Sequence, residues 1–279
     1  MAAFRGDGPS PPKEERQNQE NMARLGSIPR TELYGKRQNT YSLKYKFPVP
    51  VALRHQLITT LKNLVALVGV ARSGGDLKAI ADLVDSLIDS PQMAACLGRC
   101  RDQENGAAMI DGRYPPLQPD MALLRSMPVG SLGRSYAELM LSRGYDPEFF
   151  RPRPLLSDAH WLTQRIATTH DIHHVVSGFG TTPEGESGVL AITATQIGFP
   201  AYVMLNNAAQ VSRFRFKSNR YALLGRAIAH GTTIGFQAQP LWQARWEEGW
   251  DWPVETWRQL LGITQPATVE PYGLQPICG

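Results

Sequence analysis

Cysteine is scarce in this 279-residue sequence, which contains only Cys96, Cys100 and Cys278. An odd, low number without paired spacing gives no disulfide framework and is typical of a reducing compartment. Cys96 and Cys100 lie four residues apart and therefore share one face of a helix. We interpret this pair as two small buried apolar side chains, with a contribution to a metal site as the alternative.

Strong charge and long apolar runs are also missing. Charged residues make up 19% of the chain and the net charge is +4. This excess is too small and scattered to indicate nucleic-acid binding, although it is compatible with weak attraction to an anionic membrane surface. No apolar run is long enough to predict a transmembrane helix. The nearest candidate, 187–212, has no charged residue, but Gly198 and Pro200 interrupt it and favour a buried helical hairpin.

The amino-terminal region has no apolar stretch and carries acidic residues such as Asp7 and Glu14. We therefore expect neither a secretory signal nor a mitochondrial transit peptide, and we expect a cytoplasmic protein. Residues 1–48 are polar and interrupted by proline and glycine, which predicts a partly disordered arm. Residues 49–263 are predicted to form one helical domain, and 264–279 a proline-rich tail.

Apolar residues in the predicted domain recur with helical periodicity, and no segment shows sustained alternation. The sequence therefore predicts an all-α fold of roughly eight to ten helices without a significant sheet. The predicted helices are 49–72, 76–88, a short one from Pro91, 131–143, 158–177, one from near Glu186, one from Pro200, 221–236 and 253–261. The stretch 103–128 is interpreted as a long connection, and Trp242 and Trp246 as parts of a short amphipathic segment.

The most informative segment is THDIHHVVSGFGTTPEGE, which ends at Glu186. His170 and His174 are separated by about 40 degrees around a helix with 3.6 residues per turn, and Asp171 lies with them within roughly 100 degrees. The glycine-rich loop allows the chain to reverse, so that Glu186 can return beside the end of the first helix. Two imidazoles and two carboxylates predict a mixed nitrogen and oxygen site for a divalent metal.

The histidine pair also has a simpler explanation, and other histidines lie nearby in the sequence. A His pair at this spacing is also found on helix surfaces and in hydrogen-bonded cores. His173 is rotated about 100 degrees from His174 and is given a supporting or solvent-exposed role. His160 lies nearly three turns before His170 and is interpreted as too distant to bind the same ion.

The segment HDIHH, followed by eleven residues and then Glu186, resembles the HDxxH-x11-E metal motif of the ubiquinone (coenzyme Q) biosynthesis protein four family, or Coq-four family. Two further blocks are similar to that family: LRSMPVGSLGRSYAELM over 124–140 and LWQARWEEGWDWPVETWRQLLGI over 241–263. The resemblance covers most of 49–263. Because the amino-terminal arm does not resemble a transit peptide, we expect a bacterial homologue.

The resemblance implies an all-helical protein with one divalent metal ion and no other cofactor. It assigns both metal binding and catalysis to His170, Asp171, His174 and Glu186. Zinc is the ion we expect, with iron, cobalt and magnesium as alternatives. The resemblance further implies a polyprenylated quinone precursor as ligand, other quinone-biosynthesis enzymes as partners, and peripheral association with the inner face of a membrane. A homodimer is left open, and no nucleic-acid partner is expected.

Three functions are compared. The resemblance favours oxidative decarboxylation at carbon one of a polyprenylated hydroxybenzoate ring. The alternative is a non-catalytic prenyl-lipid-binding scaffold that organises a quinone-biosynthesis complex. A helical HD-type phosphohydrolase ranks last, because that site needs a further distant His and Asp, and no upstream His is convincingly placed.

Several features of the sequence are compatible with more than one interpretation. Small residues such as Gly188 and Ala208 allow either close helix packing or an apolar tunnel beside the metal. The late tryptophans could form a membrane-interface belt or pack the last helices. Arg134 and Tyr136, in the second matching block, are weak candidates for supporting the site.

Overall fold

The computed structural model of the chain describes residues 77–115, 117–144 and 154–275. The chain divides into two compact units, Met1–Pro50 and Val51–Gly279, and every described residue belongs to the second unit. The predictions for the arm 1–48, for the helix 49–72, for Cys278 and for the start of the 76–88 helix fall outside the described residues.

Within these residues the protein is α-helical, which confirms the predicted fold class. Its ten α-helices are α4 (Leu77–Leu87), α5 (Pro91–Asp102), α6 (Gly106–Asp111), α7 (Met121–Ser126), α8 (Leu132–Arg143), α9 (Asp158–Ser177), α10 (Pro183–Ile197), α11 (Pro200–Phe216), α12 (Tyr221–Gln237) and α13 (Val254–Leu261). The only β-type pairing in this part of the chain consists of two isolated bridges, Ser131–Pro253 and Phe179–Gly273. The predicted connection 103–128 was wrong, because it contains both α6 and α7.

The helix boundaries follow local sequence signals. At the start of α9, the Ser157 side chain accepts a hydrogen bond from the backbone N–H of His160. At its end, Gly178 adopts the left-handed conformation with φ of 75°, which costs glycine little because it has no Cβ. These two signals define the helix predicted over 158–177.

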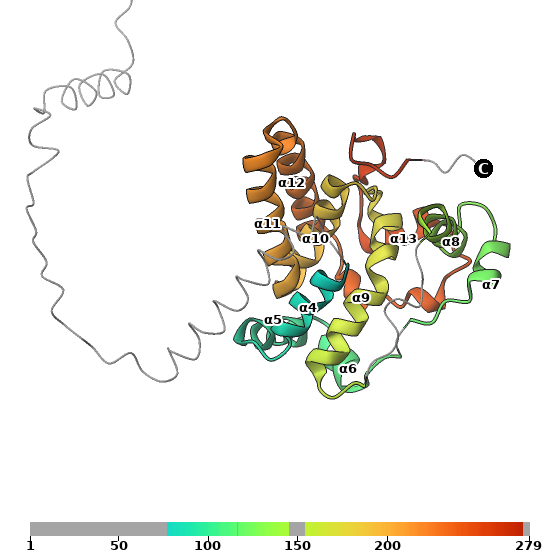
Figure 1. Cartoon of the computed structure of the whole chain (residues 1–279). Coiled ribbons are helices and arrows are strands. Elements are labelled where there is room, and N and C mark those ends of the chain that lie inside the picture. The colour runs from blue at the N-terminus through green and yellow to red at the C-terminus, as the bar shows by residue number, and fades with distance from the viewer. Residues whose placement is uncertain (1–76, 116, 145–153, 276–279) are drawn as a thin grey trace, which may run out of the picture. The chain divides into compact units, whose positions relative to one another are not determined.

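Helix α9 is central among the described helices and packs against α5, α6, α8, α10 and α13 (Figure 1). On one side of α9 lies α10, and the most extensive contact of α10 is with α12. There, a Cβ placed on Gly231 would lie only 2.0 Å from the carbonyl oxygen of Gly188. Glycine at this position therefore permits the close approach of α10 and α12, as the small-residue pattern allowed.

Buried apolar side chains fill both sides of α9. Cys96 and Cys100 are fully buried on α5, which confirms their interpretation as small core residues. Trp242, Trp246 and Trp257 are also buried, whereas Trp252 is 39% exposed. Packing is therefore the main role of the late tryptophans. The predicted amphipathic segment around Trp242 and Trp246 is instead two 3₁₀ turns.

No helix among the described residues combines the length and the apolar character needed to cross a membrane.

Candidate metal centre

The site forms where α9 reverses into α10. His170 and His174 lie one turn apart on α9, and the left-handed Gly178 ends that helix. Thr182 then caps α10 by accepting a hydrogen bond from the backbone N–H of Gly185. The turn is tight, since a Cβ on Gly185 would lie 1.9 Å from the carbonyl oxygen of Gly180. This geometry returns Glu186 to the two imidazoles, as the sequence predicted.

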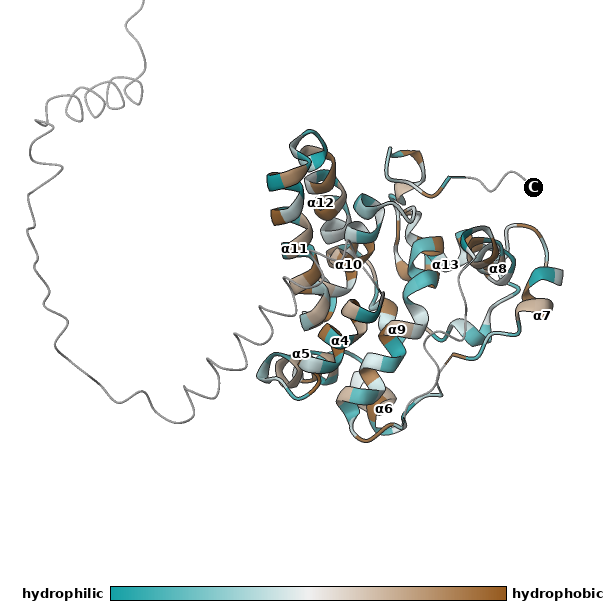
Figure 2. Ribbon diagram, in the orientation of Figure 1, coloured by the Kyte–Doolittle hydropathy of each residue, from teal (hydrophilic) through white to brown (hydrophobic). Residues whose placement is uncertain are grey.

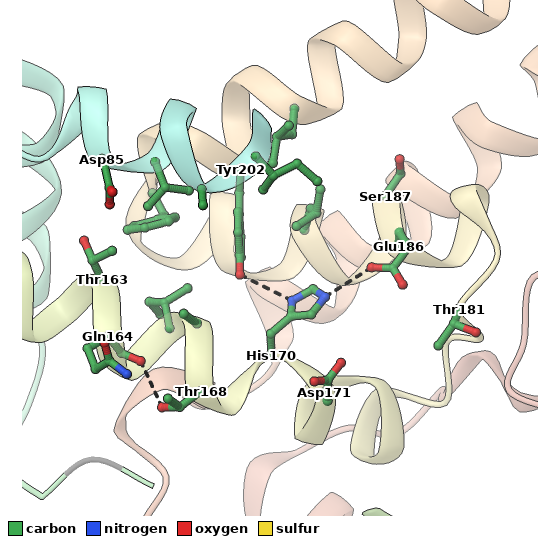
Figure 3. Close-up of a pocket in the computed structure, with 18 of the residues that line it drawn as sticks. Asp85, Thr163, Gln164, Thr168, His170, Asp171, Thr181, Glu186, Ser187 and Tyr202 are labelled. Carbon is green, nitrogen blue, oxygen red and sulfur yellow. Dashed lines mark hydrogen bonds and ion pairs between the residues drawn. The ribbon is translucent and has the colours of Figure 1, made fainter. Parts of the chain in front are cut away.

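Three donor atoms from these residues form a nearly equilateral triangle. The Oε2 atom of Glu186 lies 3.1 Å from Nε2 of His170 and 3.3 Å from Nε2 of His174. The two Nε2 atoms are 3.2 Å apart. Figure 3 shows His170 pointing at Glu186 from the adjacent helix. The His174 side chain is fully buried, whereas those of His170 and Glu186 are partly exposed.

This triangle fits a divalent metal. In a tetrahedral zinc site with bonds of about 2.0–2.1 Å, neighbouring donor atoms are roughly 3.3–3.4 Å apart. The three separations in the protein are within a few tenths of an ångström of that value. Two imidazoles and one carboxylate with an open fourth position are also a donor set of catalytic zinc sites.

The electrostatics of the site follow from burying charges together. Burial favours neutral His174, but the adjacent Glu186 carboxylate outweighs it and raises the pKa of His174 to about 9. Burial likewise opposes the charge of Glu186, yet His174 and His170 lower the pKa of this carboxyl well below its usual range. Without a metal ion, the pair is therefore an ionic hydrogen bond, and a bound cation would take the place of the His174 proton.

The predicted ligand Asp171 is not part of the donor triangle. Only His170, His174 and Glu186 bring ligand atoms within 4.8 Å of one another among the described residues. Asp171 lines the same cavity and is close enough for its charge to raise the pKa values of Tyr136 and Tyr202 (Figure 3). Asp171 therefore lies in the wall of the cavity, outside the donor triangle.

A cavity of about 1370 Å³ opens from the triangle between α4, α9 and α11. Apolar side chains form much of its wall, including Val84, Ile166 and Leu205. Ala208 and Ala209 also line it, so the small residues of this region serve both the close packing of helices and the cavity. Its size exceeds the roughly 300–1000 Å³ of typical ligand pockets.

A comparison with protein-family models shows which family the chain belongs to. The family model described as coenzyme Q (ubiquinone) biosynthesis protein Coq4 matches residues 54–267. The chain belongs to this family. The match contains Asp171 and all three residues of the donor triangle, so the Coq4 resemblance seen in the sequence is confirmed.

Individual Coq4 relatives agree. The chain is 31% identical over 150 residues to the bovine ubiquinone biosynthesis protein COQ4 homolog, mitochondrial, covering 53% of this chain and 56% of that protein. It is 25% identical over 249 residues to the Yarrowia lipolytica ubiquinone biosynthesis protein COQ4, mitochondrial, covering 86% and 94% respectively. In several such matches, including the bovine one, the chain spans about half the length of the relative.

A solved bacterial structure shares the fold. The crystal structure of a Nostoc punctiforme protein named for ubiquinone biosynthesis superposes with a TM-score of 0.68 and 27% identity. The superposition covers 74% of this chain and 99% of that one. The bacterial source of this Coq4-like structure is consistent with the expected bacterial homologue.

The remaining candidates from the sequence lie outside the triangle. His160 binds the Ser157 hydroxyl through Nδ1 at 2.8 Å and is not among the clustered donors, as expected. The solvent-exposed role for His173 was wrong: this side chain is buried beside Trp246, and its ring nitrogens have no hydrogen-bond partner among the described residues. Arg134 binds the Glu138 carboxylate on its own helix, and does not line the cavity.

Two side-chain contacts near the site of this Coq4-family chain were not predicted from the sequence. The hydroxyl of Tyr202, from α11, lies 3.3 Å from Nδ1 of His170. The buried carboxylate of Glu184 accepts two hydrogen bonds of 2.9 Å from Arg220 and also pairs with Arg213. No sequence spacing predicts these contacts, because each joins α9 or α10 to a residue on a different helix or turn.

A carboxy-terminal strap, which we define as residues 267–275, holds the loop between the two ligand helices. The backbone N–H of Leu274 donates to the carbonyl of Gly178 at 2.7 Å, and that of Gly180 to the carbonyl of Tyr272 at 2.8 Å. The Tyr272 ring stacks on Phe179, with centroids 5.6 Å apart. The carbonyl of Phe179 in turn lies 3.0 Å from Nδ1 of His174. The strap therefore supports His174 indirectly, through Phe179, although most of the strap lies beyond the family match.

Proposed function

We propose that this chain acts in ubiquinone or related prenylquinone biosynthesis, as a metal-dependent enzyme that removes the carboxylate from carbon one of a polyprenylated hydroxybenzoate with oxidation. The observation that carries the proposal is the donor triangle of His170, His174 and Glu186, two of which, His170 and Glu186, line a large, mostly apolar cavity. The triangle suits the polar head of such a molecule, and the cavity suits its isoprenoid chain.

The donor set narrows the choice of metal ion. Zinc is the expected ion, and iron is the main alternative because two histidines and one carboxylate also form the non-haem iron(II) site of oxygenases. When bound, either ion supplies Lewis-acid polarisation of the oxygens that it contacts. We assign His170, His174 and Glu186 as the ligands, with Asp171 as a neighbouring carboxylate.

The chain's own side chains supply the other interactions. Burial raises the pKa values of Tyr136 and Tyr202, and the charge of Asp171 raises them further. Both phenols therefore stay protonated near neutral pH and can donate hydrogen bonds to a substrate oxygen. The Asp171 carboxylate, which lines the same cavity, can accept the proton of a ring hydroxyl. The apolar part of the wall limits the access of bulk water to the reacting ring.

The proposed reaction balances with dioxygen as oxidant. The bond between ring carbon one and the carboxyl carbon breaks, a bond from that carbon to oxygen forms, and carbon dioxide leaves. Aromatic acid, water and dioxygen then give phenol, carbon dioxide and hydrogen peroxide. Two electrons pass from the acid to dioxygen, and a further two-electron donor would reduce the peroxide to water.

The test is release of carbon dioxide from a polyprenyl hydroxybenzoate labelled at its carboxyl carbon. Purified protein loaded with zinc, iron, cobalt or magnesium should release label under air, and His174→Ala should abolish release. An exposed carboxylate variant, Glu248→Gln, should behave as the wild type. Absence of label release with every one of these metals would reject the enzymatic proposal.

We further propose that the end of α11 binds the surface of an anionic membrane. Phe214 and Phe216 are 70% and 75% exposed, and Val211 is also exposed. Arg215 and Lys217 are exposed between and beside them. Figure 2 shows hydrophilic residues in the turn that follows α11, next to hydrophobic segments. Adjacent aromatic and basic side chains suit an interface between acyl chains and anionic headgroups.

Vesicle co-sedimentation tests this surface. The double variant Phe214→Ser, Phe216→Ser should bind vesicles containing phosphatidylglycerol at least tenfold more weakly, because each inserted phenylalanine contributes roughly 1.5–3 kcal/mol. Phe236→Ser is the matched control, since Phe236 is 79% exposed near the carboxy-terminal end of α12, whereas the proposed surface lies before the amino-terminal end of that helix. Equal binding by all three proteins would reject this surface.

The scaffold alternative, in which the chain binds prenyl lipid and partner enzymes without catalysis, would also use an exposed surface of this kind. In that case partner enzymes should co-purify with the wild type and be lost in the Phe214 and Phe216 double variant. His174→Ala, if folded, should retain them. Labelled carbon dioxide released by the purified protein alone would reject a purely scaffolding role.

A further inference from the structure

The second nitrogen of each imidazole in the donor triangle has its own partner. Nδ1 of His174 lies 3.0 Å from the carbonyl oxygen of Phe179. A carbonyl can only accept, so this nitrogen carries a hydrogen and donates it. In neutral His174 the lone pair then lies on Nε2, which is the nitrogen that points at His170 and Glu186.

His170 has an equivalent arrangement with a different partner. Its Nδ1 lies 3.3 Å from the hydroxyl of Tyr202, and its Nε2 is the atom that joins the triangle (Figure 3). Tyr202 is almost completely buried, and its ring packs edge-on against Phe199 with centroids 5.0 Å apart. A buried ring held in this way cannot easily move its hydroxyl away from His170.

A tyrosine hydroxyl can donate or accept, and the two cases differ for the metal. If Tyr202 donated to Nδ1, neutral His170 would carry its hydrogen on Nε2 and present it to the other donors. If Tyr202 accepts from Nδ1–H, the lone pair of Nε2 faces the triangle. The second case gives three lone pairs directed at one point, which is what a cation requires.

We infer that Tyr202 is a positioning residue for the metal, which accepts a hydrogen bond from Nδ1–H of His170 and so fixes the ring with Nε2 as ligand. This inference rests on the proposed metal site. It adds a contact from α11 to a site otherwise built by α9 and α10. Partners of this kind typically change metal affinity by 10–100-fold when removed.

The test compares two conservative variants in the full chain. Tyr202→Phe removes only the hydroxyl and keeps the packing on Phe199. Tyr136→Phe is the matched control, since Tyr136 is a buried tyrosine of the same cavity and the described contacts include none between it and either histidine. Zinc affinity is measured by competition with a chromogenic chelator, and ligand geometry by the visible absorption of the cobalt-substituted protein.

Tyr202→Phe should weaken zinc binding about tenfold and shift the cobalt spectrum. Tyr136→Phe should leave both as in the wild type. If the wild type binds zinc and His174→Ala does not, but Tyr202→Phe matches the wild type in both measurements, the role of Tyr202 is rejected while the metal site stands. If zinc binding is equal in wild type and His174→Ala, the proposed site itself fails.

A measurement on the wild type covers the case in which Tyr202→Phe does not fold. Long-range ¹H–¹⁵N spectra of the zinc-loaded protein identify which nitrogen of each histidine carries a proton. The expected result is a protonated Nδ1 and a metal-bound Nε2 for His170. A metal-bound Nδ1 in His170 would overturn the inference.

Discussion

Replacement of Glu186 by glutamine tests the metal centre with the smallest change in side-chain shape. The glutamine keeps one oxygen of the carboxyl group but loses the negative charge that lies 3.1 Å from His170 and 3.3 Å from His174. We expect metal affinity to fall steeply while the helical fold remains, because the carboxylate supplies the only negative charge of the triangle.

The size of the loss can be worked out from the donor set. Structural zinc sites with four ligands contribute about 10–16 kcal/mol, so one ligand contributes roughly 3 kcal/mol, or a hundredfold in affinity. Metal at a hundred times its Kd stabilises a protein by about 2.7 kcal/mol, which raises Tm by roughly 5–11 °C for a unit of this size. Glu186→Gln should lose most of that rise at the same metal concentration.

Chelator competition and thermal unfolding, each with and without zinc, provide the two measurements. Glu248→Gln is the control, because Glu248 is an exposed carboxylate whose contacts, to Arg245 and Tyr114, lie outside the donor triangle. The reasoning is refuted if Glu186→Gln binds zinc as tightly as the control does and shows the same rise in Tm.

Three other predictions concern packing, charge and pH. Gly231→Ala should lower the free energy of unfolding by roughly 1–3 kcal/mol in urea, since its Cβ would lie 2.0 Å from the Gly188 carbonyl oxygen. Gly225→Ala in the same helix meets open space and should raise it by about 0.5–1 kcal/mol; equal effects would contradict the close helix contact. Glu184→Gln removes the charge of a buried carboxylate that pairs with the half-exposed Arg220 and should cost roughly 1.5–3 kcal/mol, and a loss under about 0.5 kcal/mol would show that the pair is dispensable. The pKa of metal-free His174 is raised to about 9, so below that pH a metal ion must displace the His174 proton. Metal affinity should therefore increase with pH up to about 9 and then level off. A flat affinity profile from pH 6.5 to 9 in calorimetric titrations would contradict this.

The helices of the site could be predicted because their signals are local. Ser157 and Gly178 define α9 through capping and a left-handed glycine, and the i, i+4 rule places His170 and His174 on one face. The short loop then leaves Glu186 little freedom. Each of these arguments spans fewer than two dozen residues, which is the range over which helix geometry fixes relative positions.

The missed features all depend on tertiary packing. That Asp171 binds the ion stays a prediction: its carboxylate lines the cavity but is not among the clustered donor atoms, and helix geometry alone does not fix where this side chain points. The burial of His173 was missed because α13 and the 3₁₀ turns cover that face of α9, and their arrangement is not encoded in the motif. Tyr202 and Tyr272 approach the site from helices or segments with no fixed spacing to it.

The strap also has a consequence for the order of events in folding. Helices α9 and α10 can form from local interactions, but the pairing of Gly178 and Gly180 with Tyr272 and Leu274 requires distant parts of the chain to meet. Loop-closure entropy makes such contacts slow relative to helix formation. In refolding experiments, helical circular dichroism should therefore recover before the protein regains the ability to capture zinc.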